Sequence, residues 1–300
     1  MDYLAAFERE LNSPAAQPER LALLFGVLDK PNLDIDHYLD QLNDLAQQVD
    51  DHLPAEDDRA RADALRIVLH EEMGFVGNQT NYHHPDNSFL HRLLETRTGL
   101  PITLSLLYIA LGRRLSIPLE GMGFPGHFML RFQDARETLL FDPFNGRSIA
   151  PDAVDAYLTQ LFNQHIALEL PVETYAVTTS ALILRMLNNL RIVYLSQENL
   201  ELAQSTLDFL VLISPHETAF WRERALLRYQ TGHLLGAESD LRRVFYQRQQ
   251  IQHFIEARPA GHAQPFMPIF DVDQPMQPSR DTLDLMSLLD RIRQNISRLN

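Results

Sequence analysis

The chain has 300 residues and a mass of 34.5 kDa, and its 45% apolar and 22% charged residues are typical of a folded globular protein, which excludes a disordered chain. The formal net charge of −14 argues against binding to phosphate backbones, so we expect no nucleic-acid partner. The absence of cysteine excludes a thiol nucleophile, thiolate metal sites and disulfides, and a chain that needs no oxidation is expected in the cytoplasm.

The N-terminal part is predicted to be helical, with short acidic connections. It lacks the basic start of a signal peptide, and no stretch of the chain approaches the ~18 apolar residues of a membrane span, so we expect no membrane partner. Apolar residues recur at helical spacing over 21–27, and Pro31 ends that segment. A second helix is expected after Asp34 or Asp36, either of which can cap it, and a third is expected to open at Pro54.

A polar segment over residues 78–91 has a composition that raises the question of a metal site. It contains an aspartate and three histidines, at His83, His84 and His91. Their spacing fits no ligand pattern, such as two histidines four residues apart on one helix face, so we predict neither a metal nor a cofactor and keep a metal site as an alternative. We expect the histidines on the loop surface, with Asn87 or Ser88 capping the next helix.

The pattern changes near residue 100 to that of the centre of a domain. Residues 102–111 are apolar on nearly every side, which predicts a helix buried all round, and Pro101 suits its first turn because no amide donor is needed there. Three β-like runs follow, at residues 119–124, 127–132 and 138–142. The last two are predicted to form an antiparallel hairpin.

The predicted hairpin brings together two residues that could carry chemistry, His127 and Asp142. With a turn centred near residues 134 and 135, the two are expected to pair across the strands, where Cβ atoms lie ~5 Å apart. A carboxylate at that distance can orient an imidazole, which is the base half of a nucleophilic triad. The nucleophile would come from the N-terminus of the buried helix that begins at Pro101.

After Pro171 the chain is predicted to be helical to residue 256. Ala203 and Ala237 lie 34 residues apart, which is the period of tetratricopeptide units, and each can be the small residue at which two helices cross. The second unit departs from the pattern at Arg228, where an aromatic residue is expected, and a plain helical bundle is the alternative. Repeats of this kind offer a concave groove for a peptide or helix.

The C-terminal part combines an extended segment with one amphipathic helix. Residues 259–278 contain five prolines and are expected to pack on the body as an extended segment that could cover the repeat groove. Residues 280–299 carry an apolar stripe at helical spacing, formed by Leu285, Leu289, Ile292 and Ile296. The stripe is either the seam of a homodimer or a docked cap on the last repeat.

Several motifs in combination resemble a known family. Arg97-Thr-Gly-Leu-Pro101, Gly126-His127-Phe-Met-Leu-Arg-Phe132 and Phe141-Asp142-Pro143 resemble the core of the transglutaminase-like superfamily. A more specific resemblance is to bacterial regulator-of-sirC-type proteins, which have Asn-Ser-Phe-Leu before the core, then Phe-Pro-Gly-His-Phe and Asp-Pro-Phe-Asn-Gly, and tetratricopeptide repeats behind. The resemblance covers residues 20–250.

The resemblance implies an α+β fold that is mostly helical. Its core would be papain-like in arrangement, with a buried helix and a small antiparallel sheet, followed by an all-α tetratricopeptide-like region. We therefore expect three parts: residues 1–170 with the helical N-terminal region and the transglutaminase-like domain, residues 171–256 with the repeats, and residues 257–300 with the proline-rich segment and the last helix.

The sequence departs from the superfamily at the nucleophile. The family's cysteine aligns on Pro101, whereas His127 and Asp142 keep their positions; the hydroxyls of Thr103 and Ser105 are nearby but are expected to bond preceding helix carbonyls. We therefore predict a non-catalytic, regulatory module that binds a protein or peptide partner. The alternative is an amide hydrolase or acyl transferase in which Thr103 or Ser105 attacks, His127 is the base and Asp142 orients it.

Overall fold

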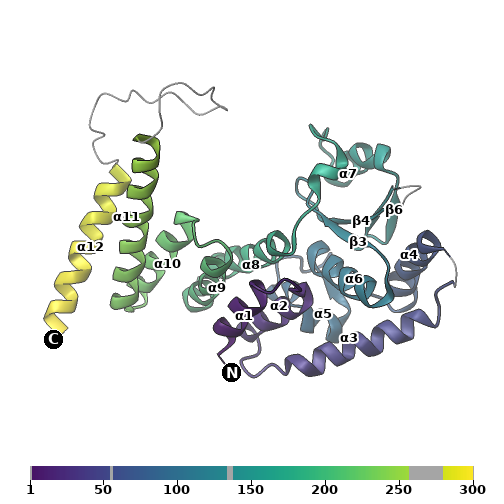
Figure 1. The fold of residues 1–300 in the computed structure, drawn as a ribbon, viewed down its shortest axis with the longest axis horizontal. Helices are drawn as coiled ribbons and strands as arrows, with labels where there is room; N and C mark the ends of the chain where they lie inside the picture. Colours follow the sequence, from purple (N-terminus) through teal and green to yellow (C-terminus); the bar gives the residue numbers. More distant parts are fainter. Residues whose placement is uncertain (1, 55–56, 134–137, 257–279, 300) are drawn as a thin grey trace. The chain divides into compact units, whose positions relative to one another are not determined.

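The computed structural model describes residues 2–54, 57–133, 138–256 and 280–299, and Figure 1 shows the course of the chain. The chain divides into two compact units, Met1–Glu198 and Asn199–Asn300, which are described separately. The predicted division into three parts, with boundaries at residues 170 and 256, stays a prediction.

The N-terminal unit begins with helices whose starts are fixed by acidic caps. α1 (Tyr3–Leu11), α3 (Ile35–Asp50) and α4 (Asp58–Ile67) follow Asp2, Asp34 and Asp57, and each of these side chains accepts a hydrogen bond from a first-turn backbone amide. Of the two caps predicted for α3, Asp34 is therefore the one used. Between α1 and α3, α2 (Pro18–Phe25) starts on a proline and continues as the 3₁₀ turn η1 (Gly26–Leu28). A π-helical turn, η2 (Val68–Glu72), extends α4.

The centre of this unit is α6 (Pro101–Leu115), and 12 of its 15 residues are buried, as predicted from its apolar sequence. The chain reaches α6 through η3 (Pro85–Ser88), α5 (Leu90–Thr96) and a short parallel pair formed by β1 (Val76–Gly77) and β2 (Thr98–Gly99). The helix ends at Ser116, whose positive φ of 58° lets its amide close the last turn on Gly112.

An antiparallel sheet follows, with strands in the order β3 (Leu119–Met122), β4 (Met129–Gln133), β5 (Thr138–Asp142) and β6 (Arg147–Ile149). The predicted hairpin is present, but its register was wrong by two residues. Leu130 pairs with Phe141 and Gln133 with Thr138, so β4 begins after His127, and His127 is not the strand partner of Asp142. Gln133 and Thr138 are the residues at which the described pairing of β4 and β5 ends, and they fix this register. β6 was not predicted, because its three residues follow directly on a turn.

One side of the sheet packs on α7 (Val154–Phe162), which follows the 3₁₀ turn η4 (Pro151–Ala153). Buried apolar residues of the sheet and of α7 form one cluster, made of Met122, Phe124, Met129, Leu140, Ile149, Val154 and Leu158. A further 3₁₀ turn, η5 (Val172–Tyr175), leads to α8 (Thr179–Ser196), which is capped by Thr178. The fold is thus mostly helical with a small antiparallel sheet, as predicted.

The C-terminal unit contains α9 (Leu200–Ile213), α10 (Thr218–Gln230), α11 (Leu234–Glu256) and α12 (Arg280–Leu299). Ala203 and Ala237, the small residues of the two predicted repeats, are fully buried. Figure 1 shows α11 and α12 side by side, and the apolar stripe of α12 packs on residues of α10 and α11. Within this unit the stripe therefore forms a docked cap. The homodimer remains a prediction, and the segment 259–278 lies outside the described residues.

Candidate functional site

His127 is presented by a tight turn that its sequence dictates. In Phe124-Pro-Gly-His127, Pro125 suits the second position of a type II turn, and Gly126 has the positive φ of 72° that the third position needs. The amide of His127 donates to the carbonyl of Phe124 at 3.2 Å, which closes the turn. The predicted β-run from residue 127 thus begins with a turn residue that places the imidazole ahead of β4.

Asp142 lies at the end of β5 and is fully buried. One of its carboxylate oxygens accepts from the amides of Phe144 and Asn145, at 2.9 and 3.2 Å, which is the Asx turn expected of an Asp-Pro sequence. The other oxygen lies 2.8 Å from Nε2 of His127 and also accepts from the Asn145 side chain at 2.9 Å and the Tyr157 hydroxyl at 2.5 Å. The structure therefore brings His127 and Asp142 together despite the shift in register.

The charge of Asp142 is held by these hydrogen bonds. Burial alone would raise its pKa, but the bonds from His127, Tyr157 and Asn145 outweigh burial and hold the pKa of Asp142 below its ordinary value. An ionised carboxylate only accepts, so Nε2 of His127 carries the proton of this hydrogen bond. Burial raises the pKa of the Tyr157 hydroxyl most, and the neighbouring Asp142 carboxylate raises it further. The hydrogen bond from His127 to Asp142 therefore holds the imidazole in one orientation.

Pro101 occupies the first position of α6, where the resemblance places a nucleophile. The nearby hydroxyls of Thr103 and Ser105 are fully buried and have no hydrogen-bond partner, so the expected bonds to preceding helix carbonyls were wrong. Neither hydroxyl lines the cleft that Pro101 and His127 share. Thr103 and Ser105 are thus separated from any ligand in that cleft.

The cleft beside Pro101 has a volume of about 240 Å³. It is lined by Tyr82, Leu100, Pro101, Ile102, Gly126, His127, Phe128, Arg185 and Asn189. The imidazole of His127 also lies near the rings of Phe144 and Phe162, with centroids 6.5 and 6.3 Å away. Most of the lining residues are apolar, but the surface exposed in the hollow is more polar than apolar, so polar groups are prominent in it.

Sequence reasoning missed three of the polar or aromatic residues that line the cleft, Tyr82, Arg185 and Asn189. Arg185 is the one charged residue in the stretch Ala181-Leu-Ile-Leu-Arg-Met-Leu-Asn-Asn-Leu190, and an isolated charge in an apolar helix is a signal that could have identified it. Tyr82 and Asn189 carry no comparable signal, because only the fold brings residues 82, 101, 127 and 189 to one hollow.

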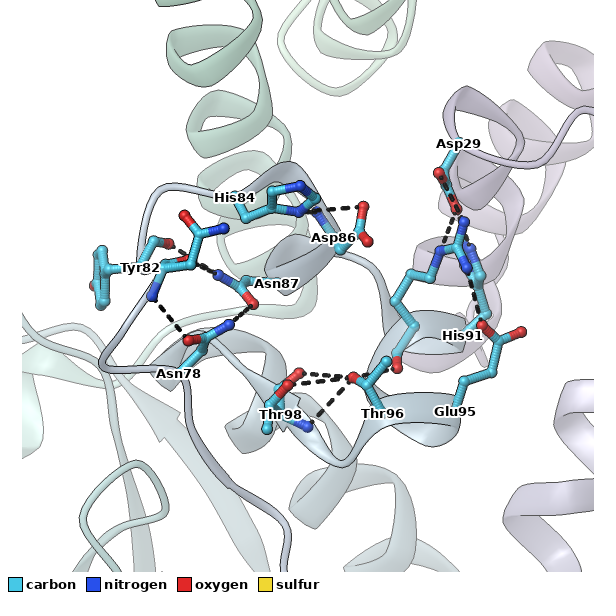
Figure 2. Close-up of polar contacts among 12 residues, drawn as sticks. Asp29, Asn78, Tyr82, His84, Asp86, Asn87, His91, Glu95, Thr96 and Thr98 are labelled. Carbon is cyan, nitrogen blue, oxygen red and sulfur yellow. Dashed lines mark hydrogen bonds and ion pairs between the residues drawn. The ribbon is translucent and has the colours of Figure 1, made fainter.

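The histidines of the polar segment do not converge. Figure 2 shows His84 beside Asp86 and His91 beside Asp29, in different parts of the segment. His91 is fully buried and bonded through Nε2 to Asp29 at 2.8 Å, so its expected position on the loop surface was wrong. In the described part of the chain no group of three metal-ligating side chains is close enough to hold an ion, so the metal alternative has no observation in its favour.

Asn87 stabilises the loop of this segment. The prediction that Asn87 or Ser88 caps α5 was wrong. α5 begins after Phe89 without a side-chain cap. The Asn87 amide nitrogen donates to the carbonyls of Asn81 and Tyr82, at 2.7 and 3.0 Å, and its oxygen accepts from Asn78 at 3.0 Å (Figure 2). These bonds hold the loop that carries Tyr82.

The comparisons with known proteins agree with this architecture. Residues 36–188 match the family model of the transglutaminase-like superfamily, and residues 190–263 match a tetratricopeptide repeat model. A UPF0162 protein of Xylella fastidiosa (strain 9a5c) is 31% identical over 74% of this chain and 80% of its own length. Protein SirB1 of Salmonella typhimurium is 25% identical over 77% of this chain and 84% of its own.

A eukaryotic relative shares a shorter region. F-box only protein 21 of Homo sapiens is 31% identical over 57% of this chain and 28% of its own length. None of the helices in the described part of this chain combines the length and apolar character that crossing a bilayer requires. By the family-model matches and by these bacterial relatives, the chain belongs to the transglutaminase-like superfamily, in a SirB1-like bacterial family with a tetratricopeptide region behind the transglutaminase-like domain.

Proposed function

We propose that the chain is a non-catalytic transglutaminase-like protein that acts in the cytoplasm as a protein-binding or regulatory module, through its cleft and its helical repeats. The observation that carries this proposal is Pro101, a residue without a reactive side chain, in a cleft that His127 shares. The His127–Asp142 pair would remain as a hydrogen bond that fixes the Phe124–His127 turn to the sheet.

The repeat region supports binding as the second half of this function. Tetratricopeptide units pack helix against helix and expose a concave surface that suits a peptide or helix. Large apolar side chains are exposed in the C-terminal unit, where Leu235 is 72% and Tyr246 55% exposed. Scattered apolar side chains are common on protein surfaces, so binding is inferred from the repeat architecture and not from these two residues.

Protein capture with the full chain tests the cleft half of the proposal. Asn189→Trp would fill the cleft, whereas Ile192→Trp places the same side chain on an exposed position of the same helix. We expect specific partners, quantified by mass spectrometry, that are retained by the wild type and by Ile192→Trp and lost from Asn189→Trp. Identical partner sets for both variants, each shown to be folded by circular dichroism, would count against a role for the cleft.

The alternative function is acyl transfer or amide hydrolysis by Thr103 or Ser105, and the intact His127–Asp142 pair is the observation in its favour. Both hydroxyls are fully buried and neither lines the cleft, so the geometry supports this alternative less well. It requires that an acyl-directed probe such as a fluorophosphonate labels one hydroxyl and that His127→Ala abolishes the label. We expect no labelling of either hydroxyl.

A further inference from the structure

We propose that the cleft beside Pro101 binds the C-terminal carboxylate of a peptide that ends in an apolar residue, and that Arg185 is the residue that recognises the carboxylate. The inference rests on the proposed binding function and names the chemistry of the partner. Three observations carry it: a cation in the cleft with no acidic partner among the described residues, a cleft lining without acidic residues, and apolar side chains beside a hollow of about the size of one side chain.

Arg185 contacts an aromatic ring but has no acidic partner among the described residues. Its guanidinium carbon lies 5.3 Å from the centroid of the Phe128 ring, a cation–π contact that orients the group. Across the described residues, no ion pair or side-chain hydrogen bond involves Arg185. Partial burial lowers the pKa of its guanidinium, because the site removes water without supplying a counter-charge.

The backbone opposite leaves room for this side chain. A Cβ at Gly123 would lie 2.3 Å from Nη1 of Arg185, so only glycine allows the guanidinium its position. The position has no positive φ that would require glycine for the backbone, so glycine is required by the close approach of side chains, nearest of all Arg185 and then Val177, whose Cγ1 would lie 3.0 Å from such a Cβ. The backbone at Gly123 thus makes room for the Arg185 cation, for which the described part of the chain supplies no acidic partner.

A carboxylate is the group that complements this arrangement. Arginine binds carboxylates through two parallel charge-assisted hydrogen bonds, and these are stronger where water is partly excluded. None of the residues that line the cleft is acidic, and the nearby Asp142 is fully buried and bonded to His127, Tyr157 and Asn145. Since the whole chain has a net charge of −14, general electrostatics would repel an anion, so any preference for one must arise locally at Arg185.

The rest of the lining suits the last residue of a peptide. Tyr82, Leu100, Ile102 and Phe128 supply apolar surface, and a volume of about 240 Å³ holds a single large side chain with its carboxylate. Asn189 adds an amide that can pair with the final peptide group. The last residue of a peptide carries a carboxylate, a peptide group and a side chain, and these three groups match Arg185, Asn189 and the apolar residues of the lining.

The Tyr82 wall is positioned by the braced loop. The Asn87 side chain donates to the carbonyl of Tyr82 at 3.0 Å, and the backbone carbonyl of Asn87 accepts from the amide of Leu100 at 3.1 Å. Figure 2 shows Asn87 between Asn78 and the Tyr82 loop. One asparagine therefore ties together two walls of the cleft, Tyr82 and Leu100.

Calorimetric titration of the full chain with matched dipeptides tests the inference. The probes are acetyl-Leu-Phe with a free carboxylate, the same peptide as its C-terminal amide, and acetyl-Glu-Phe-amide, which carries its carboxylate on a side chain. We expect the free acid to bind at least about tenfold more tightly than either amide, because only the acid places its charge at the end of the chain. Arg185→Gln should reduce the preference to less than about twofold, while Arg9→Gln, an equal change of charge at an exposed residue outside the cleft, should leave it intact.

Two further variants keep the test decisive if Arg185→Gln is poorly folded. Gly123→Ala retains the charge of Arg185 but displaces its guanidinium, so it should also remove the preference for the acid. Tyr82→Ala removes apolar wall and should weaken the acid and its amide by the same factor. Melting curves identify the folded variants.

Equal affinity for acid and amide, no binding of the acid at millimolar concentration, or a preference that survives both Arg185→Gln and Gly123→Ala would overturn the inference. Binding of acetyl-Glu-Phe-amide as tight as that of the free acid would assign the site to acidic side chains and overturn the C-terminal assignment. Two separate results would contradict the proposed function: labelling of a hydroxyl that depends on His127, or partner capture that is unchanged by Asn189→Trp. Neither measurement depends on the difference in affinity between acid and amide.

Discussion

Among the arginines that lie over aromatic rings, Arg185 of the N-terminal unit and Arg224 of the C-terminal unit differ in whether an acidic side chain pairs with them. Arg224 in α10 lies 4.8 Å from the Trp221 ring, donates to both oxygens of Asp240 at 2.7 and 2.9 Å, and bonds Asp208 at 2.9 Å. Arg185 in α8 lies 5.3 Å from the Phe128 ring, and no acid among the described residues pairs with it. Arg224 is therefore neutralised by acidic side chains of the protein itself, whereas Arg185 is available to pair with a ligand.

The paired network also explains the departure of the second repeat from its pattern. Arg228, where an aromatic residue is expected, bonds Asp208 at 2.9 Å and Asp240 at 3.0 Å. Two arginines and two aspartates thus replace an apolar contact between helices of the repeat. Burial still raises the pKa of Asp208, an effect that the two arginines only partly offset.

The largest effect is expected from breaking the paired arginine. Arg224→Met would leave Asp240, which is 2% exposed, with Arg228 as its remaining cation, so the free energy of unfolding should fall by about 3–5 kcal/mol. Urea unfolding measures this change. Arg291→Met, at an exposed position of α12, is the control and should change stability by less than about 1 kcal/mol. An equal effect of the two substitutions would mean that the network contributes no stability.

The next largest effect is expected at Asp142. Asp142→Ala would leave the buried imidazole of His127 and the half-buried donors of Tyr157 and Asn145 without this acceptor, and should cost about 2–4 kcal/mol in urea unfolding. Asp152→Ala, at an exposed residue, is the control and should cost less than about 1 kcal/mol.

Asp142 should also give a pH dependence of known sign. Its pKa is lowered in the folded state, so its contribution is fully present above the ordinary value of 3.8 and is lost as the pH falls through the lower folded value. The stability difference between the wild type and Asp142→Asn should therefore shrink only below pH 3.8. A difference that disappears at a higher pH would contradict the lowered pKa.

A smaller effect, of opposite sign, is expected at the buried hydroxyls. Thr103 is fully buried and its hydroxyl has no hydrogen-bond partner, so Thr103→Val removes a desolvated polar group and should raise the free energy of unfolding by about 1 kcal/mol. Loss of stability on this substitution, measured in urea, would show that the hydroxyl makes a favourable interaction.

The smallest effect is expected at the unpaired arginine. Arg185→Met removes a partly desolvated cation with which no acid in the described ranges pairs, so stability should change by less than about 1 kcal/mol, in contrast to Arg224→Met. Thermal and urea unfolding of the two variants side by side give the comparison. A loss at Arg185 as large as that at Arg224 would assign it a structural role and contradict its availability to a ligand.

Local motifs made the architecture and part of the site predictable. The apolar run after Pro101 identified the buried helix, and the predicted hairpin identified the His127–Asp142 contact, although the cross-strand pairing on which that prediction rested is not the one observed. The hairpin register was wrong by two, since it depends on the pairing of Gln133 with Thr138 and not on a turn centre alone. Arg185 was missed because the lack of an acidic partner is a property of the folded surroundings, and the burial of His91 depends on Asp29, which lies 62 residues away.

The central claim is that Pro101 occupies the position of a nucleophile in the cleft that it shares with His127, while the His127–Asp142 pair is intact. The most direct test is the alkylation rate of Pro101→Cys by iodoacetamide; because the chain has no other cysteine, the label reports on position 101 alone. A thiol beside the His127–Asp142 pair has a lowered pKa, so we predict alkylation at neutral pH at least about tenfold faster than for Ile192→Cys at an exposed site, and a slow rate in Pro101→Cys/His127→Ala. Equal rates in all three variants would contradict the claim.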